Sequence, residues 1–315
     1  MDPEGPAGDA RRAIVDAHVH VFDHTANRHP FLEERDATFA ALVGDYSAMP
    51  RTYTLDDYLR DSRSRRVEGI VWHEFLSDDP VREARWGQAL AEASPVPQAV
   101  VARVEFADPG LPERLEAYRA LPNVTAVREH LAWDPGDPLR RFAARPGLLG
   151  DPAWRTGLSH LRGWDVACGL EVFADQLPDM LEVVRLQPDI RFTVAVMGWP
   201  LDVTAEGRAR WQRSVVALSR CENVSASISA VECVLGMDWT VDLARPWFET
   251  LIGGFGPDRC MLGGHLPISL LSRDHAALYD AYDALLSGLS PGEQDRVFRG
   301  TAAAWFGLDR LRSQP

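Results

Sequence analysis

The chain has 315 residues, of which 46% are hydrophobic and 25% charged, a composition typical of a globular enzyme and unlike a disordered or fibrous protein. Its formal net charge of −13 argues against nucleic acid or an anionic membrane surface as a partner, because both bind a basic face. The chain contains no Lys, which excludes Schiff-base chemistry and a carboxylated-lysine metal bridge.

The N-terminal segment 1–12 is rich in Gly and Pro and has no apolar run, so we expect a flexible lead rather than a signal peptide. No stretch approaches the roughly 18 consecutive apolar residues of a membrane span. The four cysteines have no C-x-x-C spacing, which favours reduced thiols and a cytoplasmic protein over disulfides or a thiolate zinc site. They are Cys168, Cys221, Cys233 and Cys260.

Short β-branched runs alternate with longer amphipathic segments through the rest of the chain. In chain order, the predicted strands are 13–21, 68–75, 98–106, 123–131, 165–173, 190–197, 223–229 and 259–265. Helical periodicity fills the intervals, for example at 111–121, 176–186 and 208–219. This alternation predicts an α/β fold, a distorted TIM-like (β/α)8 barrel forming a single domain over residues 13–310.

Two longer segments interrupt the alternation, at 22–53 after the first strand and at 132–152 after the fourth. Both follow the C-terminal end of a predicted strand, which is the active-site face of such a barrel. We therefore interpret the two insertions as walls or a lid over a pocket.

The first predicted strand, "IVDAHVHVFD" (14–23), carries the first candidates for chemistry. Residues two apart in a strand point to the same face, so His18 and His20 are expected to project together, and Asp16 shares their parity. Near the C-terminal end of a barrel strand, the inward face leads to the catalytic mouth. A hydrogen-bonded core histidine is the structural alternative.

Several short motifs follow one another in a fixed order along nearly the whole chain. After "VDAHVHVFD" come "RTYTLDDYL" (51–59), "GIVWHEF" (69–75), "AVREHL" (126–131), "GLEVF" (169–173), "GWP" (198–200), "ENVSASIS" (222–229) and "FGPDRCMLGGHLP" (255–267). Together they resemble the amidohydrolase superfamily in its amidohydrolase-2 branch, which holds sugar-lactone and pyrone-dicarboxylate lactonases and metal-dependent decarboxylases. The resemblance is greatest to the lactonase group and implies a barrel with its site at the strand C-termini.

Two positions depart from the pattern that this resemblance implies. Val196 stands where the family usually has a histidine, and His265 stands where it usually has an aspartate that binds metal or carries a proton. A histidine can act as a base or a neutral nitrogen ligand near neutral pH, but it does not carry a carboxylate's charge. The expected catalytic residues are therefore His18, His20 and His265.

A metal site is the next hypothesis. One divalent ion, with zinc the natural candidate, would use His18, His20 and His265 together with Glu171 at the end of the fifth strand, or Asp16, as the anionic ligand. A metal-independent mode is the alternative.

Substrate contacts are expected from neighbouring strands. Arg128 offers a fork for a carboxylate, or else pairs with Glu129 or Glu105, and His130 lies two residues further on. His73 and Glu74 should point to opposite faces, so that at most one of them, with His73 the candidate, lines the pocket. Three tryptophans are expected near the mouth: Trp72, Trp199 and Trp239.

These residues predict a hydrolase that opens a lactone or similar cyclic ester or amide of a small carboxylated or ring-bearing substrate. Water would attack the carbonyl and lose its proton to His265, while His18, His20 or a metal they hold polarises the carbonyl oxygen. A lyase on the same barrel, such as a decarboxylase, dehydratase or cyclase, and a catalytically silent ligand-binding barrel are the alternatives. The expected partner is a small molecule, and a homo-oligomer is left open.

Overall fold

The computed structural model describes residues 11–96 and 98–312, and its centre is an eight-stranded sheet curled into a barrel. All strand pairs in this sheet are parallel. In sheet order the strands are β1 (Ala13–Val19), β4 (Arg66–His73), β5 (Gln98–Arg103), β6 (Val124–His130), β7 (Ala167–Glu171), β8 (Arg191–Val194), β9 (Val224–Ile228) and β10 (Cys260–Leu262). The eight predicted strands and the TIM-like fold are confirmed. Residues 1–10 of the predicted lead lie outside the described residues.

The first and last strands close the barrel through a few residues past their ends. Val19 forms a parallel bridge with Leu266, and the backbone N–H of His265 donates to the carbonyl oxygen of His18 at 2.6 Å. The N–H of His20 donates to the carbonyl of Leu266 at 2.8 Å. The hydrogen bonds that close the barrel are therefore made by the backbone of the candidate histidines themselves.

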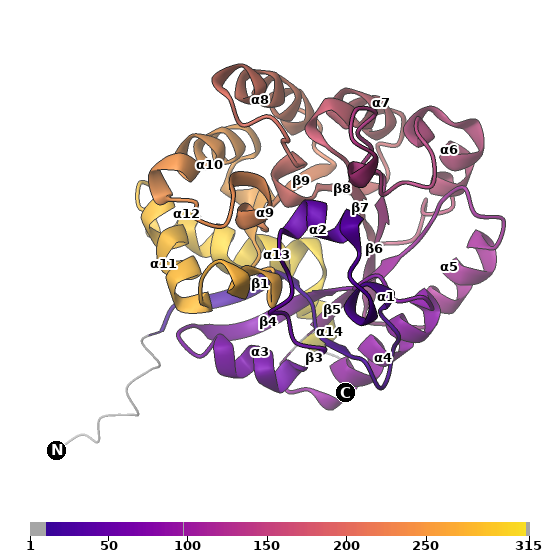
Figure 1. Ribbon diagram of the computed structural model, residues 1–315, viewed down its shortest axis with the longest axis horizontal. Coiled ribbons are helices and arrows are strands. Elements are labelled where there is room, and N and C mark those ends of the chain that lie inside the picture. Colours follow the sequence, from indigo (N-terminus) through magenta and orange to yellow (C-terminus); the bar gives the residue numbers. More distant parts are fainter. Residues whose placement is uncertain (1–10, 97, 313–315) are drawn as a thin grey trace.

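Helices surround the strands in Figure 1, as expected where short β-branched runs alternate with amphipathic segments. The outer helices are α3 (Leu55–Asp61), α4 (Pro80–Ala93), α5 (Leu111–Arg119), α6 (Pro152–Ser159), α7 (Leu177–Leu186), α8 (Ala205–Ser219), α10 (Val241–Phe255) and α11 (His275–Leu285). Side-chain caps begin most of them. Asp79, for example, accepts from the N–H of Arg82 at the start of α4, where Pro80 fixes the first turn. No helix among the described residues is long and apolar enough to cross a membrane.

The barrel interior is filled by small and β-branched side chains and sealed by the C-terminal helices. Val15, Ala17, Val71 and Val101 pack in one cluster with Phe306. The sealing helices are α13 (Thr301–Trp305) and α14 (Leu308–Arg312), and α12 (Pro291–Asp295) precedes them on the outside. Because the interior is packed at this level, a ligand can enter only from the opposite end, where the strands finish.

The two predicted insertions contain short elements near that end. The first holds β2 (Phe22–Asp23), α1 (Pro30–Glu33), α2 (Ala37–Val43) and β3 (Thr52–Tyr53), and the second holds two single turns. A further short helix, α9 (Val231–Leu235), follows β9. In Figure 1, α2 lies across the strands, and it contacts both α9 and a turn of the second insertion.

The packing of α6 against the loop after β5 leaves no room for a side chain at Gly157. A Cβ there would lie 1.9 Å from the carbonyl oxygen of Phe106, which is backbone and cannot rotate away. We predict that Gly157→Ala lowers the free energy of unfolding by about 1–3 kcal/mol. Gly253→Ala in α10 is the matched control, since no atom lies within 4 Å of its new Cβ, and it should be neutral or stabilising by up to about 1 kcal/mol. Urea unfolding measures both, and equal effects would contradict the packing argument.

Candidate active site

The backbone is strained around the end of the barrel where the strands finish. Among the described residues, every non-glycine residue with a positive φ follows the end of β4, β8, β9 or β10. They are Leu76, Val196, Met197, Trp199, Ala230 and His265. Such conformations are costly for L-residues and concentrate at functional sites, so this rim is the first place to look for chemistry.

Three buried histidines meet at this rim. One ring nitrogen each from His18, His20 and His265 lies within 4.8 Å of the others. The Nε2 atoms of His18 and His20 are 3.1 Å apart. The sequence prediction that His18 and His20 face one site with His265 agrees with this geometry.

The second nitrogen of each ring is held by a neighbouring oxygen. His18 Nδ1 lies 2.8 Å from Ser229 Oγ, His20 Nδ1 lies 3.1 Å from the carbonyl oxygen of His73, and His265 Nδ1 lies 2.7 Å from Glu232 Oε1. A carbonyl and a carboxylate accept, so His20 and His265 each donate from Nδ1, and Nε2 is the nitrogen that faces the site. Metal-binding histidines are held in this way, with the free nitrogens directed to one point.

The rings of His18 and His20 are neutral. Burial, followed by the nearby His73, holds the pKa of His18 well below its usual range. Burial, followed by the positive charge of Arg128, does the same to the pKa of His20. Neutral imidazoles are the form that binds metals, so the donor set fits a zinc ion with three histidine ligands.

Asp16 does not join this group, so its predicted parity with the histidines is wrong. The pairing of β1 with β4 shifts between Asp16 and Val19, which places one extra residue in β1 and turns His18 inward. Asp16 instead faces the surrounding helices, where it accepts from Tyr58 and from the backbone N–H groups of His18 and Gly264. Its role is to hold the backbone of the two closing strands.

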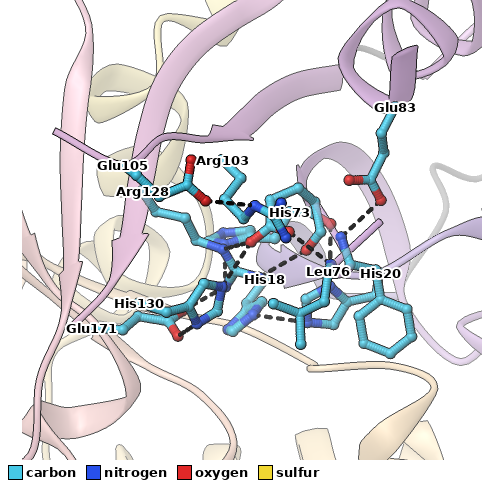
Figure 2. A network of polar contacts seen from close by, with 12 residues as sticks. His18, His20, His73, Leu76, Glu83, Arg103, Glu105, Arg128, His130 and Glu171 are labelled. Atoms are coloured by element: carbon cyan, nitrogen blue, oxygen red, sulfur yellow. Dashed lines mark hydrogen bonds and ion pairs between the residues drawn. The ribbon is translucent and has the colours of Figure 1, made fainter. Parts of the chain in front are cut away.

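A second buried group, composed of charged side chains, lies beside the histidines (Figure 2). Arg128 donates from Nε to Glu74 at 2.7 Å and from Nη1 to Glu171 at 2.5 Å. His130 contacts the same two carboxylates, through Nε2 at 2.9 Å from Glu74 and through Nδ1 at 2.8 Å from Glu171. We call these four residues the charged network.

The charged network fixes the protonation of its members. Burial alone would raise the pKa of Glu171, but Arg128 and His130 outweigh it and lower that pKa to about 2. Burial alone would lower the pKa of His130, but Glu171 and the hydrogen bonds to both carboxylates outweigh it and raise that pKa to about 9. At neutral pH, two cations therefore face two carboxylates.

The charged network changes the roles that the sequence predicts for Glu171 and Arg128. Glu171 is committed to the charged network and is not among the groups that could hold a metal with the histidines. Arg128 pairs with Glu74 and Glu171, and not with Glu129 or Glu105 as its structural alternative proposed. It thus presents no free fork to a substrate carboxylate.

The expectation that His73 and Glu74 point to opposite faces is also wrong, although neither of them lines the cavity above the histidines, so His73 is not placed to contact a substrate there. β4 ends at His73, so strand alternation does not extend to Glu74, which reaches Arg128 and His130. His73 lies deeper, where its ring is 4.1 Å from that of His18 and its Nε2 lies 3.1 Å from the carbonyl oxygen of Ala17. His73 therefore packs beneath His18, on the barrel-interior side of the site.

The three predicted tryptophans lie in different surroundings in the structure. Trp199 lines the cavity above the histidines, as expected. Trp72 faces the helices instead, donating to the carbonyl oxygen of Val21, and Trp239 stacks with the guanidinium of Arg273. The expectation that Trp72 and Trp239 flank the mouth is therefore wrong.

The cavity above the histidines has a polar floor and an apolar roof. His18, His20, Arg128, His130, Glu171 and His265 form its floor. The other lining residues are apolar apart from the thiol of Cys233 and the indole N–H of Trp199: Phe39, Leu42, Val43, Phe75, Leu76, Phe142, Val196, Trp199 and Ile268. Phe39, Leu42 and Val43 come from α2, and Phe142 comes from the second insertion, so both insertions wall the cavity.

Glu232 is the important residue that sequence reasoning missed. It lies in α9, is 2% exposed, and accepts from the ring of His265 and from the hydroxyl of Ser269. A single acidic residue inside the apolar run "AVECVL", just after a strand that ends at the rim, was the available signal. With His265 and Cys233 it forms a second group that could ligate a metal.

Comparison with known proteins decides the family. The amidohydrolase family model matches residues 15–308. This chain belongs to the amidohydrolase family. Among curated relatives, the uncharacterised protein y4mH of Sinorhizobium fredii is 26% identical over 93% of this chain and 98% of its own length. An L-fucono-1,5-lactonase of Burkholderia multivorans is 28% identical over 67% of this chain and 71% of its own.

Solved structures of low sequence identity share the fold. An amidohydrolase of Burkholderia multivorans with bound zinc superposes with a TM-score of 0.77 at 19% identity, covering 94% of this chain and 99% of that one. A protein of Pseudomonas putida assigned as a 2-pyrone-4,6-dicarboxylic acid hydrolase gives 0.67 at 19% identity over 94% and 98%. A 2,6-dihydroxybenzoate decarboxylase of Rhizobium gives 0.59 at 14% over 95% and 99%.

The charged network makes a prediction about stability. Arg128→Met leaves Glu74 and Glu171 buried with one cation fewer, so we expect the free energy of unfolding to fall by about 3–5 kcal/mol. Arg35→Met is the control, because that arginine is 64% exposed beside Asp45 and its loss should cost about 1 kcal/mol at most. Both are measured by urea unfolding at pH 7. A loss under about 1 kcal/mol for Arg128→Met would show that the network does not depend on its arginine.

Proposed function

We propose that this amidohydrolase-family protein hydrolyses a lactone or a similar cyclic ester. The observation that carries the proposal is the convergence of three histidine nitrogens on one cavity, with His265 oriented by the carboxylate of Glu232. The relatives that include an L-fucono-1,5-lactonase support the choice of a cyclic ester. The fold of a decarboxylase makes a lyase the outcome that the experiments must separate.

The histidines supply the groups that ester hydrolysis needs. In a metal-independent mode, Nε2 of His265 accepts the proton of the attacking water, and Glu232 stabilises the imidazolium that results. His265 then returns the proton to the ring oxygen as the carbon–oxygen bond breaks. Because Glu232 already faces Nδ1, the ring needs no reorientation for either transfer.

In a metal-dependent mode, His18, His20 and His265 would hold a zinc ion through the nitrogens left free by Ser229, His73 and Glu232. Zinc, when bound, polarises a carbonyl group and lowers the pKa of water. The two modes assign different work to His265, as a base or as a ligand. Metal content therefore separates them.

Metal content gives the first test. Protein purified without chelators is expected to contain about one zinc per chain, and the double variant His18→Ala with His20→Ala should contain none. Glu232→Gln should bind zinc about 10–100-fold more weakly, because it keeps the shape but loses the charge that orients His265. His24→Ala, a change at a largely exposed histidine, is the control and should leave the content unchanged. Active wild-type protein without zinc would instead establish the metal-independent mode.

Turnover of lactones in water labelled with oxygen-18 gives the second test. We expect one labelled oxygen in the carboxylate product, whereas a decarboxylase would release carbon dioxide and leave the remaining organic product unlabelled. His265→Asn should lower turnover by at least about 100-fold, since it removes the base or ligand. Asn is chosen because it tolerates the positive φ of 55° at this position. Full activity of a folded His265→Asn variant would contradict either role for His265.

A further inference from the structure

The roof of the cavity has a different chemistry from its floor, and the two come from different parts of the chain. Strand ends supply the histidines and the charged network, whereas α2 and the second insertion supply Leu42, Phe142 and their neighbours. The floor determines what reaction occurs. The roof contacts the rest of the substrate.

The cations of the floor are already paired. Both ring nitrogens of His130 face carboxylates, and Arg128 donates to Glu74 Oε1, to Glu171 Oε1 and, from Nη2, to the carbonyl oxygen of Glu74. In the metal-independent mode, in which no ion adds positive charge to the floor, a carboxylated substrate would add a negative charge to a buried group that is already balanced. Glu232 adds a further carboxylate next to His265, so the cost of burying another anion is high.

The roof also offers little to a hydroxyl group. Among the lining residues in the described chain, the roof side contributes two polar groups, the Cys233 thiol and the indole N–H of Trp199, and neither is a strong acceptor. A hydroxyl buried there without a partner loses its hydrogen bonds to water and gains none in return. A ring with several hydroxyls would incur this cost more than once, whereas each CH₂ of an alkyl substituent is stabilised by burial.

A path for the substituent leaves the cavity on one side. Leu76, His130 and Phe142 line both this cavity, of about 50 Å³, and a neighbouring one of about 500 Å³. The arginines of that larger cavity are also paired, Arg103 with Glu105 and Arg145 with Asp151. Because the two cavities share these lining residues, they adjoin, and a substituent on a ring held above the histidines would lie against the roof and extend toward Phe142.

We propose that the substrate is an uncharged lactone ring bearing an apolar substituent, and that Leu42 and Phe142 are specificity-determining residues that contact the substituent. This inference rests on the proposed function of lactone hydrolysis. It excludes polyhydroxylated and carboxylated lactones as preferred substrates of this chain.

The experiment compares four six-membered lactones: unsubstituted, pentyl-substituted, hydroxylated and carboxylated. We expect kcat/KM for the pentyl lactone to exceed those of the hydroxylated and carboxylated lactones by at least about 10-fold. Leu42→Gln and Phe142→Gln should each lower kcat/KM for the pentyl lactone by about 10-fold while changing that for the unsubstituted lactone less than about threefold. Leu243→Gln, at a position 46% exposed on α10, is the control and should change neither.

A second measurement separates this inference from the proposed function. Pentyl-substituted cyclohexanone has the ring, carbonyl and substituent but no ester bond, and its binding is followed by calorimetry. We expect it to bind at least about 10-fold more tightly than a hydroxylated cyclohexanone, with a negative heat-capacity change. Binding of this kind without hydrolysis of any lactone would overturn the proposed function and support the apolar ligand. Hydrolysis with a preference for hydroxylated or carboxylated lactones, or equal losses on both test lactones in the Gln variants, would overturn the inference alone.

Discussion

The candidate site depends on one constraint, the cost of burying the guanidinium of Arg128. The side chain of Arg128 is 5% exposed and comes from β6, while its partners Glu74 and Glu171 follow β4 and end β7. A buried cation of this kind is tolerated only when its donors are satisfied, so the ends of three strands are held in one arrangement. His130 completes the balance of charge.

His18 and His20 are neutral mainly because they are buried, and the charge of Arg128 in the charged network contributes to this. Arg128 and burial both lower the pKa of His20, and burial dominates for His18, so neither ring competes with the charged network for a proton. The protonated histidine is His130, which faces the carboxylates. Two kinds of histidine therefore line the same cavity: neutral rings from the end of β1, and a charged ring from the end of β6. Their surroundings, and not their residue type, assign the roles.

The fold could be predicted from the sequence because its signals are local. Runs of β-branched residues mark the eight strands, and strand alternation correctly placed Arg128 and His130 on one face of β6. What failed depended on irregular backbone or on contacts between distant residues. The extra residue in β1 reversed Asp16, the end of β4 freed Glu74 from alternation, and nothing in the sequence pairs Glu232 with His265. Alternation holds only inside a regular strand, and active sites of barrels lie where the strands stop.

The separation of floor and roof explains how a site with altered residues can remain a site. His265 stands at the position where the family resemblance leads one to expect a carboxylate. Glu232, from α9, supplies the negative charge instead, and the ring of His265 donates a hydrogen bond to it. Where a histidine is expected, Val196 stands and joins the apolar roof. The two departures therefore have different effects. His265, paired with Glu232, keeps a negative charge near the floor of the cavity, whereas Val196 places an apolar group in the roof where a histidine is expected. A change of substrate requires a departure in the roof, such as Val196, and not one on the floor, such as His265. The reason is that the roof contacts the part of the substrate that does not react.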